Sequence, residues 1–90
     1  MMRVELDGRG MRDRASVHAQ LKERLELPDY YGRNLDALYD ILTERNQPMT
    51  IVLSGASEMQ AQLGSYAEAI LETLRQVEKR NPALKVHVER

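Results

Sequence analysis

The sequence predicts an α/β fold in which a three-stranded parallel sheet packs with about four helices, in the order β-α-α-β-α-α-β. Three short apolar or alternating stretches have the length of strands, and the segments between them carry apolar residues at helical spacing. Connections long enough to hold helices usually join parallel strands, and they cross over in a right-handed sense. The chain has 90 residues, which suits one core, so we expect a single domain over residues 1–90.

The first strand and the first helix follow from alternation and capping. Residues 2–6 alternate between apolar and polar side chains, and Asp7-Gly8 indicates the turn after them. Asp13 or Ser16 can then cap a helix, and Pro28 prevents that helix from continuing. Its apolar residues recur at i, i+4 and i+8, which places them on one inward face: Val17, Leu21 and Leu25.

The second helix is expected to begin after Asn34 and to end near Thr43. Asparagine is a strong N-cap, because its side-chain oxygen can accept a hydrogen bond from a free N–H of the first turn. Beyond this cap the residues divide by face. An inward stripe has the spacing of Leu35, Leu38 and Leu42. A second set follows at i, i+3, i+4 and i+7 on another side: Asp36, Tyr39, Asp40 and Thr43.

The second half of the chain repeats the pattern of strand, two helices and strand. Residues 49–53 form an apolar run that is typical of a buried central strand. The segment from Ser57 to Gln60 resembles a capping box and predicts a short helix that a glycine closes. A second capping box, from Ser65 to Glu68, predicts a longer helix that ends at Asn81-Pro82. Residues 84–88 alternate again and complete the sheet.

The second helix carries an acidic and aromatic surface that folding alone does not require. Asp36 and Asp40 lie one turn apart, and such like charges repel by a few tenths of a kcal/mol, roughly, in an isolated helix. Tyr30, Tyr31 and Tyr39, three of the four tyrosines, lie in or just before it. Aromatic rings are enriched in interface cores, although Tyr30 or Tyr31 could instead cap the protein core. The pattern predicts a surface that a cationic partner contacts.

Negative charge is gathered around the same helix. The whole chain has a net charge of −1, but residues 26–44 hold five acidic residues against one arginine, a local net of −4. The remaining residues therefore sum to +3. This distribution favours electrostatic steering toward a basic protein, and the total argues against a general affinity for nucleic acid.

Catalytic and cofactor chemistry lack the necessary groups. The chain has no cysteine, and its two histidines, His18 and His87, are expected at the surface or its boundary without a spaced metal-binding partner. Asp36 and Asp40 would need a cleft that shifts their pKa values apart before they could act as acid and base. We therefore expect no enzyme, no cofactor and no metal site. Neither a signal peptide nor an apolar run of transmembrane length is visible, so we expect a cytoplasmic protein that does not bind membranes.

The run from Leu27 to Asp40 resembles the signature of the barstar family. Its pattern, Leu-Pro-x-Tyr-Tyr-Gly-x-Asn-Leu-Asp-Ala-Leu-x-Asp, is long, ungapped and chemically varied. Length and element order also agree, so the resemblance covers nearly the whole chain. It implies a barstar-like fold and an intracellular inhibitor whose acidic helix mimics RNA phosphates in the active site of a basic ribonuclease of the barnase type. We expect this inhibitor to be a monomer when free.

The resemblance also implies a role for each residue of the motif. Asp40 would be the central anchor in a phosphate subsite, and Asp36 would engage neighbouring cations. Tyr30 would stack at the rim, Gly32 would let the loop backbone approach closely, and Tyr39 would add packed area. The full set of expected partner-binding residues is Tyr30, Tyr31, Gly32, Asn34, Leu35, Asp36, Tyr39, Asp40, Thr43 and Gln76.

Two positions depart from the pattern of the family's best-known member. That member has an aromatic residue just past the second helix, where this chain has Arg45 or Asn46. It also has an acidic contact on the last helix, where this chain has the neutral Gln76. A related but different target nuclease, or weaker binding to the familiar one, would follow from these changes. Two other interpretations stay open, namely an immunity protein against a different cationic toxin, and an interaction protein whose partner is not an enzyme.

Overall fold

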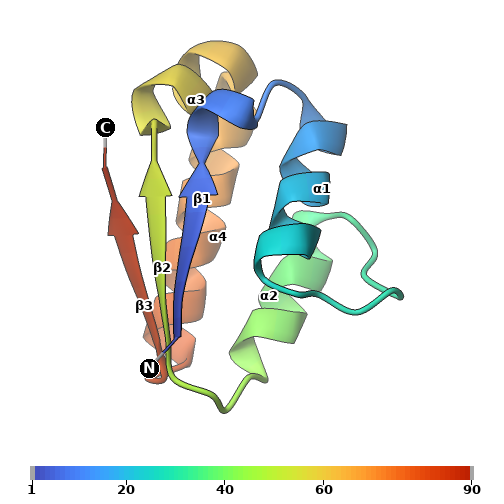
Figure 1. Ribbon diagram of the computed structural model, residues 1–90, viewed down its shortest axis with the longest axis vertical. Helices are drawn as coiled ribbons and strands as arrows, with labels where there is room; N and C mark the ends of the chain where they lie inside the picture. The colour runs from blue at the N-terminus through green and yellow to red at the C-terminus, as the bar shows by residue number, and fades with distance from the viewer. Residues whose placement is uncertain (1, 90) are drawn as a thin grey trace.

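The computed structural model describes residues 2–89, and it confirms the predicted fold class and element order (Figure 1). The parallel sheet has the order β1-β2-β3. Its strands are β1 (Met2–Asp7), β2 (Met49–Ser54) and β3 (Leu84–Val88). Between the first two strands lie the short 3-10 helix η1 (Gly8–Gly10), α1 (Arg14–Arg24) and α2 (Leu35–Thr43). Between the last two lie α3 (Ala56–Leu63) and α4 (Ser65–Arg80).

The sheet register separates an apolar face from a polar one. Val4 pairs with Ile51, which in turn pairs with Val86, and all three side chains pack in or against the core. In the preceding row, Arg3 and Lys85 are exposed on the opposite face. Successive side chains of a strand point to opposite faces of the sheet. One face of this sheet therefore packs against the helices, and the other carries exposed polar side chains.

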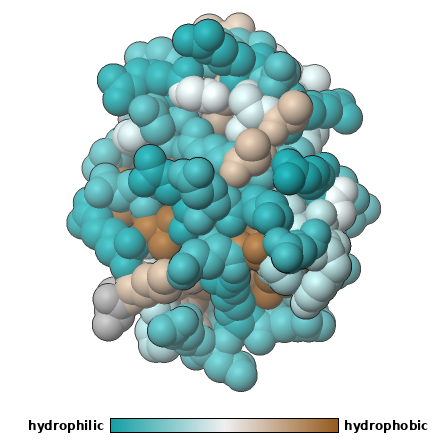
Figure 2. Space-filling model, turned by 45° about the vertical axis from the view of Figure 1, so that its right-hand side comes forward, coloured by the Kyte–Doolittle hydropathy of each residue, from teal (hydrophilic) through white to brown (hydrophobic). Residues whose placement is uncertain are grey.

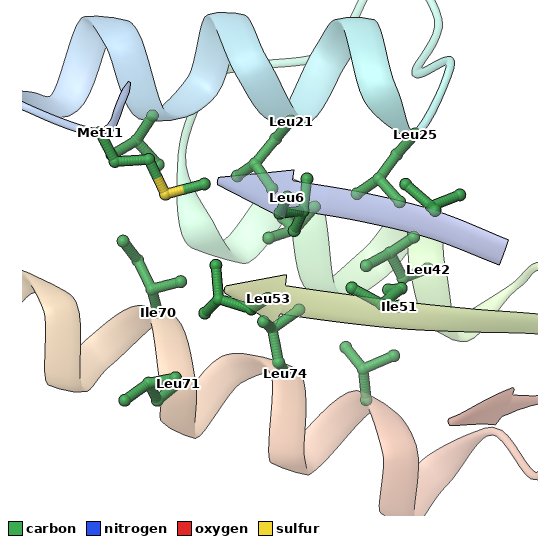
Figure 3. Close-up of a cluster of buried hydrophobic side chains, with 14 of the residues drawn as sticks. Leu6, Met11, Leu21, Leu25, Leu42, Ile51, Leu53, Ile70, Leu71 and Leu74 are labelled. Carbon is green, nitrogen blue, oxygen red and sulfur yellow. The ribbon is translucent and has the colours of Figure 1, made fainter. Parts of the chain in front are cut away.

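The core is aliphatic and lies between the apolar face of the sheet and the helices (Figure 3). Leu21 and Leu25 of α1 point toward Leu6 of β1, and Leu74 of α4 lies close to Leu53 of β2. Each of these side chains is buried. Burial of such a side chain contributes about 1.5–3 kcal/mol, so packing rather than helix propensity holds these short helices in place. Of the predicted inward stripe of α2, the outer residue Leu35 is only half-buried.

The first two predicted caps are confirmed. Asp13 accepts a hydrogen bond from the N–H of Ser16 at 2.8 Å, and the Ser16 hydroxyl accepts one from the N–H of Asp13 at 3.0 Å. Asn34 accepts a hydrogen bond from the N–H of Ala37 at 2.7 Å, so α2 begins at the residue after it. Both caps satisfy N–H groups that have no partner inside the helix.

The two capping boxes predicted for α3 and α4 are wrong. Gly55 has a left-handed conformation, with φ of 68°, and the chain turns there directly into α3 at Ala56. Gly64, with φ of 60° and ψ of −128°, ends α3 and precedes α4, so Ser65 is already helical. Neither helix has a side-chain cap. Glycine adopts both conformations without the clash that a Cβ would cause, and it therefore sets these two helix starts.

The end of α1 offers a direct test of backbone strain. Glu26 has a left-handed φ of 52°, its N–H donates to Glu23 O, and the N–H of Leu27 donates to Lys22 O at 2.9 Å. This is a Schellman ending in which glycine usually occupies the left-handed position. We expect Glu26→Gly to stabilise the protein by about 0.5–1 kcal/mol, because relief of the Cβ clash exceeds the added entropy of the unfolded chain. Glu26→Ala removes the same charge and keeps the strain, so urea denaturation should show no such gain for it.

Candidate functional site

An exposed acidic surface lies on α2. Asp36 and Asp40, which we call the acidic face, are both exposed, and Asp36 lies in the first helical turn, where the helix dipole favours a negative charge. Within residues 2–89 neither carboxylate has a hydrogen bond or an ion pair to another side chain. The two carboxylates therefore keep their acceptor sites for a partner.

The other two residues predicted on this side of α2 are less accessible. Tyr39 is half-buried and packs against the core. Thr43 is half-buried as well, and its hydroxyl donates to the carbonyl of Tyr39 at 2.8 Å. The exposed part of the predicted set is thus limited to Asp36 and Asp40, because the side of α2 that carries Tyr39 faces α4.

The loop before α2, residues 25–34, presents one of its two tyrosines. Tyr30 is 83% exposed, whereas Tyr31 is 4% exposed and belongs to the core. The expectation that Tyr31 contacts a partner directly is therefore corrected, and the alternative of a core cap describes it. Gly32 packs close to the start of α2, where an added Cβ would lie 3.2 Å from the Asn34 amide nitrogen. That same amide group donates to the Gly32 carbonyl at 3.1 Å, so Asn34 holds the loop as well as the helix start.

Two cationic side chains fasten this loop to its surroundings. The Arg45 guanidinium donates to the carbonyl of Glu26 at 3.1 Å, and the Lys22 ammonium pairs with Asp29 at 3.2 Å. Arg45 stands just past α2, and it is one of the two positions, with Asn46, at which the sequence resemblance predicted a departure from the family pattern. In this chain the position ties the loop to the end of α2. A charged hydrogen bond to a backbone carbonyl is worth more than a neutral one, which favours a single loop conformation.

A hollow of about 260 Å³ between α2 and α4 brings four predicted residues together. Its lining is Leu35, Asp36, Tyr39, Glu72, Thr73 and Gln76. Glu72 was not predicted as a site residue. Its carboxylate accepts hydrogen bonds from Gln76 at 2.8 Å and from Arg75 at 3.2 Å, and these two contacts hold the pKa of Glu72 below its usual value. The hollow therefore has a carboxylate on each of its two helices, although Gln76 itself is neutral.

The side of the molecule that carries α1, the loop and α2 is mostly hydrophilic, and hydrophobic atoms reach it only in small separate patches (Figure 2). Such a surface suits a polar and charged interface rather than a hydrophobic one. Among the described residues there is no group of three or more potential metal ligands. Within the same residues no helix is long and apolar enough to cross a membrane.

His18 does not lie where the sequence indicated. The prediction of a surface or boundary histidine is wrong, because His18 is 2% exposed and contacts two tyrosine hydroxyls. The helix face of α1 that packs inward is wider than the stripe of Val17 and Leu21 alone. His87 is exposed on β3, as its alternation predicted.

Comparison with known proteins agrees with this geometry. The family described as Barstar (barnase inhibitor) matches residues 1–89. A relative from Bacillus subtilis (strain 168), named "Putative ribonuclease inhibitor YrdF", is 41% identical over 80 residues, which cover 88% of each chain. The family match thus extends over the loop, both helices that line the hollow, and all three strands.

Proposed function

Because this chain belongs to the barstar family, we propose that it inhibits a ribonuclease by plugging the cationic active site of the enzyme with the acidic face of α2. The observation that carries the proposal is the pair of exposed carboxylates, Asp36 and Asp40, that lack partners among residues 2–89 on a helix fixed at both ends. The name of the Bacillus relative supports the same role.

The chemistry follows from what a ribonuclease must bind. Its active site holds RNA phosphates with cationic side chains, and a carboxylate on a rigid helix can accept charge-assisted hydrogen bonds from the same groups. Asp40 takes the central position, and Asp36 receives a neighbouring cation at the hollow. Exposed Tyr30 stacks on a ring at the rim. Because the helix is already ordered before binding, little conformational entropy is lost on association.

Glu72 adds a carboxylate to the hollow from α4, and this gives a testable prediction. We expect Glu72→Gln to weaken inhibition by roughly three- to tenfold, mainly through slower association at low salt, as a charge at the interface rim does. Glu68→Gln is the matched control, since Glu68 is exposed one turn earlier on α4 and also accepts a hydrogen bond from a glutamine. Equal effects of the two substitutions, measured by stopped-flow binding, would mean that only overall charge matters.

We propose a target of the barnase type, and a free inhibitor that is a monomer in the cytoplasm. A monomer leaves the acidic face open, so sedimentation equilibrium should give the mass of one chain. A dimer that covers α2 would contradict this arrangement.

A panel of cationic enzymes separates ribonuclease inhibition from the alternatives. The panel contains a barnase-type ribonuclease, a cationic deoxyribonuclease and a lysozyme, each assayed with and without the folded protein. Loss of ribonuclease activity alone is the expected result. Loss of deoxyribonuclease activity alone would favour an immunity protein against another toxin, and no inhibition at all would favour a partner that is not an enzyme.

A further inference from the structure

A buried hydrogen-bonded cluster joins the loop that carries Tyr30 to two helices. Nδ1 of His18 on α1 lies 2.5 Å from the hydroxyl of Tyr31 in the loop, and Nε2 lies 2.6 Å from the hydroxyl of Tyr66 on α4. His18 and Tyr31 are almost completely buried, while Tyr66 is partly exposed. The ring of Tyr31 is therefore held by a contact to α1 that lies beside the exposed Tyr30.

The chemistry of imidazole fixes the direction of these hydrogen bonds. A neutral ring has one donor and one acceptor nitrogen. Within residues 2–89 the buried Tyr31 hydroxyl has no other hydrogen-bond partner, so its proton must point to Nδ1. Nε2 then donates to Tyr66, whose own proton can reach solvent. Burial raises the pKa of Tyr31 to about 12, so this hydroxyl remains a donor at physiological pH.

Protonation of the ring would disrupt this arrangement. A proton on Nδ1 removes the acceptor of the Tyr31 hydroxyl and leaves a buried donor unsatisfied. The charged groups that act on the ring are Arg33 of the loop and Arg14 of α1, which lies 4.3 Å from the centre of the Tyr66 ring. Both of these side chains are cations. The other titratable side chains that contact the His18 ring are Tyr31 of the loop and Tyr66 of α4. Burial first, and these two cations next, lower the pKa of His18 below its ordinary value of 6.5.

We propose that His18 is a positioning residue for the inhibitory loop: its neutral ring fastens Tyr31 to α1 and α4, and proton uptake releases the loop before the rest of the protein unfolds. Release frees Tyr30, Gly32 and Asn34, which hold the partner side of the loop and the start of α2. The consequence for inhibition rests on the proposed function, whereas the release itself is a property of the free protein.

The sign of the pH dependence follows from linkage. An opened loop exposes His18 and restores its ordinary affinity for protons, so the open state binds more protons than the closed one. The loop therefore stays closed at pH values above 6.5, and it opens more readily as the pH falls below that value. While the closed state stays neutral, each pH unit below 6.5 multiplies the opening equilibrium by about ten.

Amide hydrogen exchange on the free protein tests this release. The N–H of Tyr31 donates to Pro28 O at 2.9 Å, and that of Asn81, which ends α4, donates to Val77 O at 2.8 Å. Exchange rates at pH 7.0 and 5.5 are divided by the intrinsic rate at the same pH. We expect the protection of the Tyr31 amide to fall about tenfold at pH 5.5, while that of the Asn81 amide stays constant.

Two variants separate His18 from other causes. His18→Gln replaces the titrating ring by an amide that still offers one acceptor and a donor, and it should abolish the tenfold response. His87→Gln removes the exposed histidine on β3 and should leave the response intact. Constant protection of the Tyr31 amide in the unmodified protein, an equal loss at Asn81, or a response that survives in His18→Gln would each overturn the proposal. No nuclease is present in these experiments, so their outcome is independent of whether the protein inhibits one.

Discussion

We expect the replacement of Asp40 by alanine to weaken inhibition of the target ribonuclease by at least about thirtyfold, or ~2 kcal/mol. Asp40 is exposed, and its carboxylate has no hydrogen bond or ion pair among residues 2–89. The Thr43 hydroxyl donates to the Asp40 carbonyl, which alanine retains, so the free protein loses no contact when the carboxylate is removed. In the proposed complex the same substitution would leave the cations of the enzyme desolvated without an acceptor, so the expected loss exceeds that of an ordinary surface charge. Inhibition constants from an RNA-cleavage assay measure the effect.

The control for Asp40→Ala is Glu58→Ala. Glu58 is an exposed carboxylate on α3, away from the acidic face, and its removal changes the net charge by the same amount. It should change inhibition by less than about threefold, because a distant exposed charge acts only through screened steering. Equal losses for both variants, or no loss for Asp40→Ala, would exclude the role of Asp40 as the anchor.

We expect the replacement of Asn81 by aspartate to destabilise the fold by about 3 kcal/mol and to lower the melting temperature by roughly 15 °C. Asn81 is 6% exposed and follows α4. Its amide nitrogen donates to the carbonyls of Leu42 at 2.9 Å and Arg45 at 2.7 Å, and its oxygen accepts from the N–H of Ala83 at 3.0 Å. A carboxylate has no donor for these two carbonyls, and it faces them with a negative charge.

Asn46→Asp provides the matched control, since Asn46 is exposed and the same substitution there should change stability by less than about 0.5 kcal/mol. Thermal unfolding followed by circular dichroism distinguishes the two variants. Because Asn81 holds the end of the helix that carries Asp40, the Asn81 variant should also inhibit more weakly. If the two variants had the same melting temperature, the hydrogen bonds of Asn81 would contribute nothing to stability.

The parts of the fold that the sequence predicted correctly depend on local chemistry. Asp13 and Asn34 cap their helices with bonds to residues three positions later. The first helix ends at Arg24, four residues before Pro28, because the chain turns at the left-handed Glu26. Alternation and helical spacing likewise act over a few residues. The starts of α3 and α4 were mispredicted because Gly55 and Gly64 adopt positive φ, a choice that the serines after them do not reveal.

The parts that the sequence could not give depend on packing between distant segments. His18 is buried because Tyr66, 48 residues later, provides a hydroxyl for its second nitrogen. Tyr31 is buried beside the same histidine, whose other ring nitrogen contacts its hydroxyl, while the neighbouring Tyr30 is exposed. Glu72 joins the site only once α4 packs against α2, and the one local sign was its spacing of four residues from Gln76. The motif therefore indicates where the candidate site lies, and tertiary contacts decide which of its residues are exposed.

The most direct measurement is steady-state inhibition of a barnase-type ribonuclease over a range of RNA concentrations, in low and in high salt. If the acidic face of α2 occupies the active site, the apparent inhibition constant rises in proportion to RNA concentration, and inhibition weakens as salt screens the carboxylates. An apparent inhibition constant that does not change with RNA concentration would contradict the claim that this surface plugs the catalytic site. A folded protein that gives no inhibition would contradict it as well.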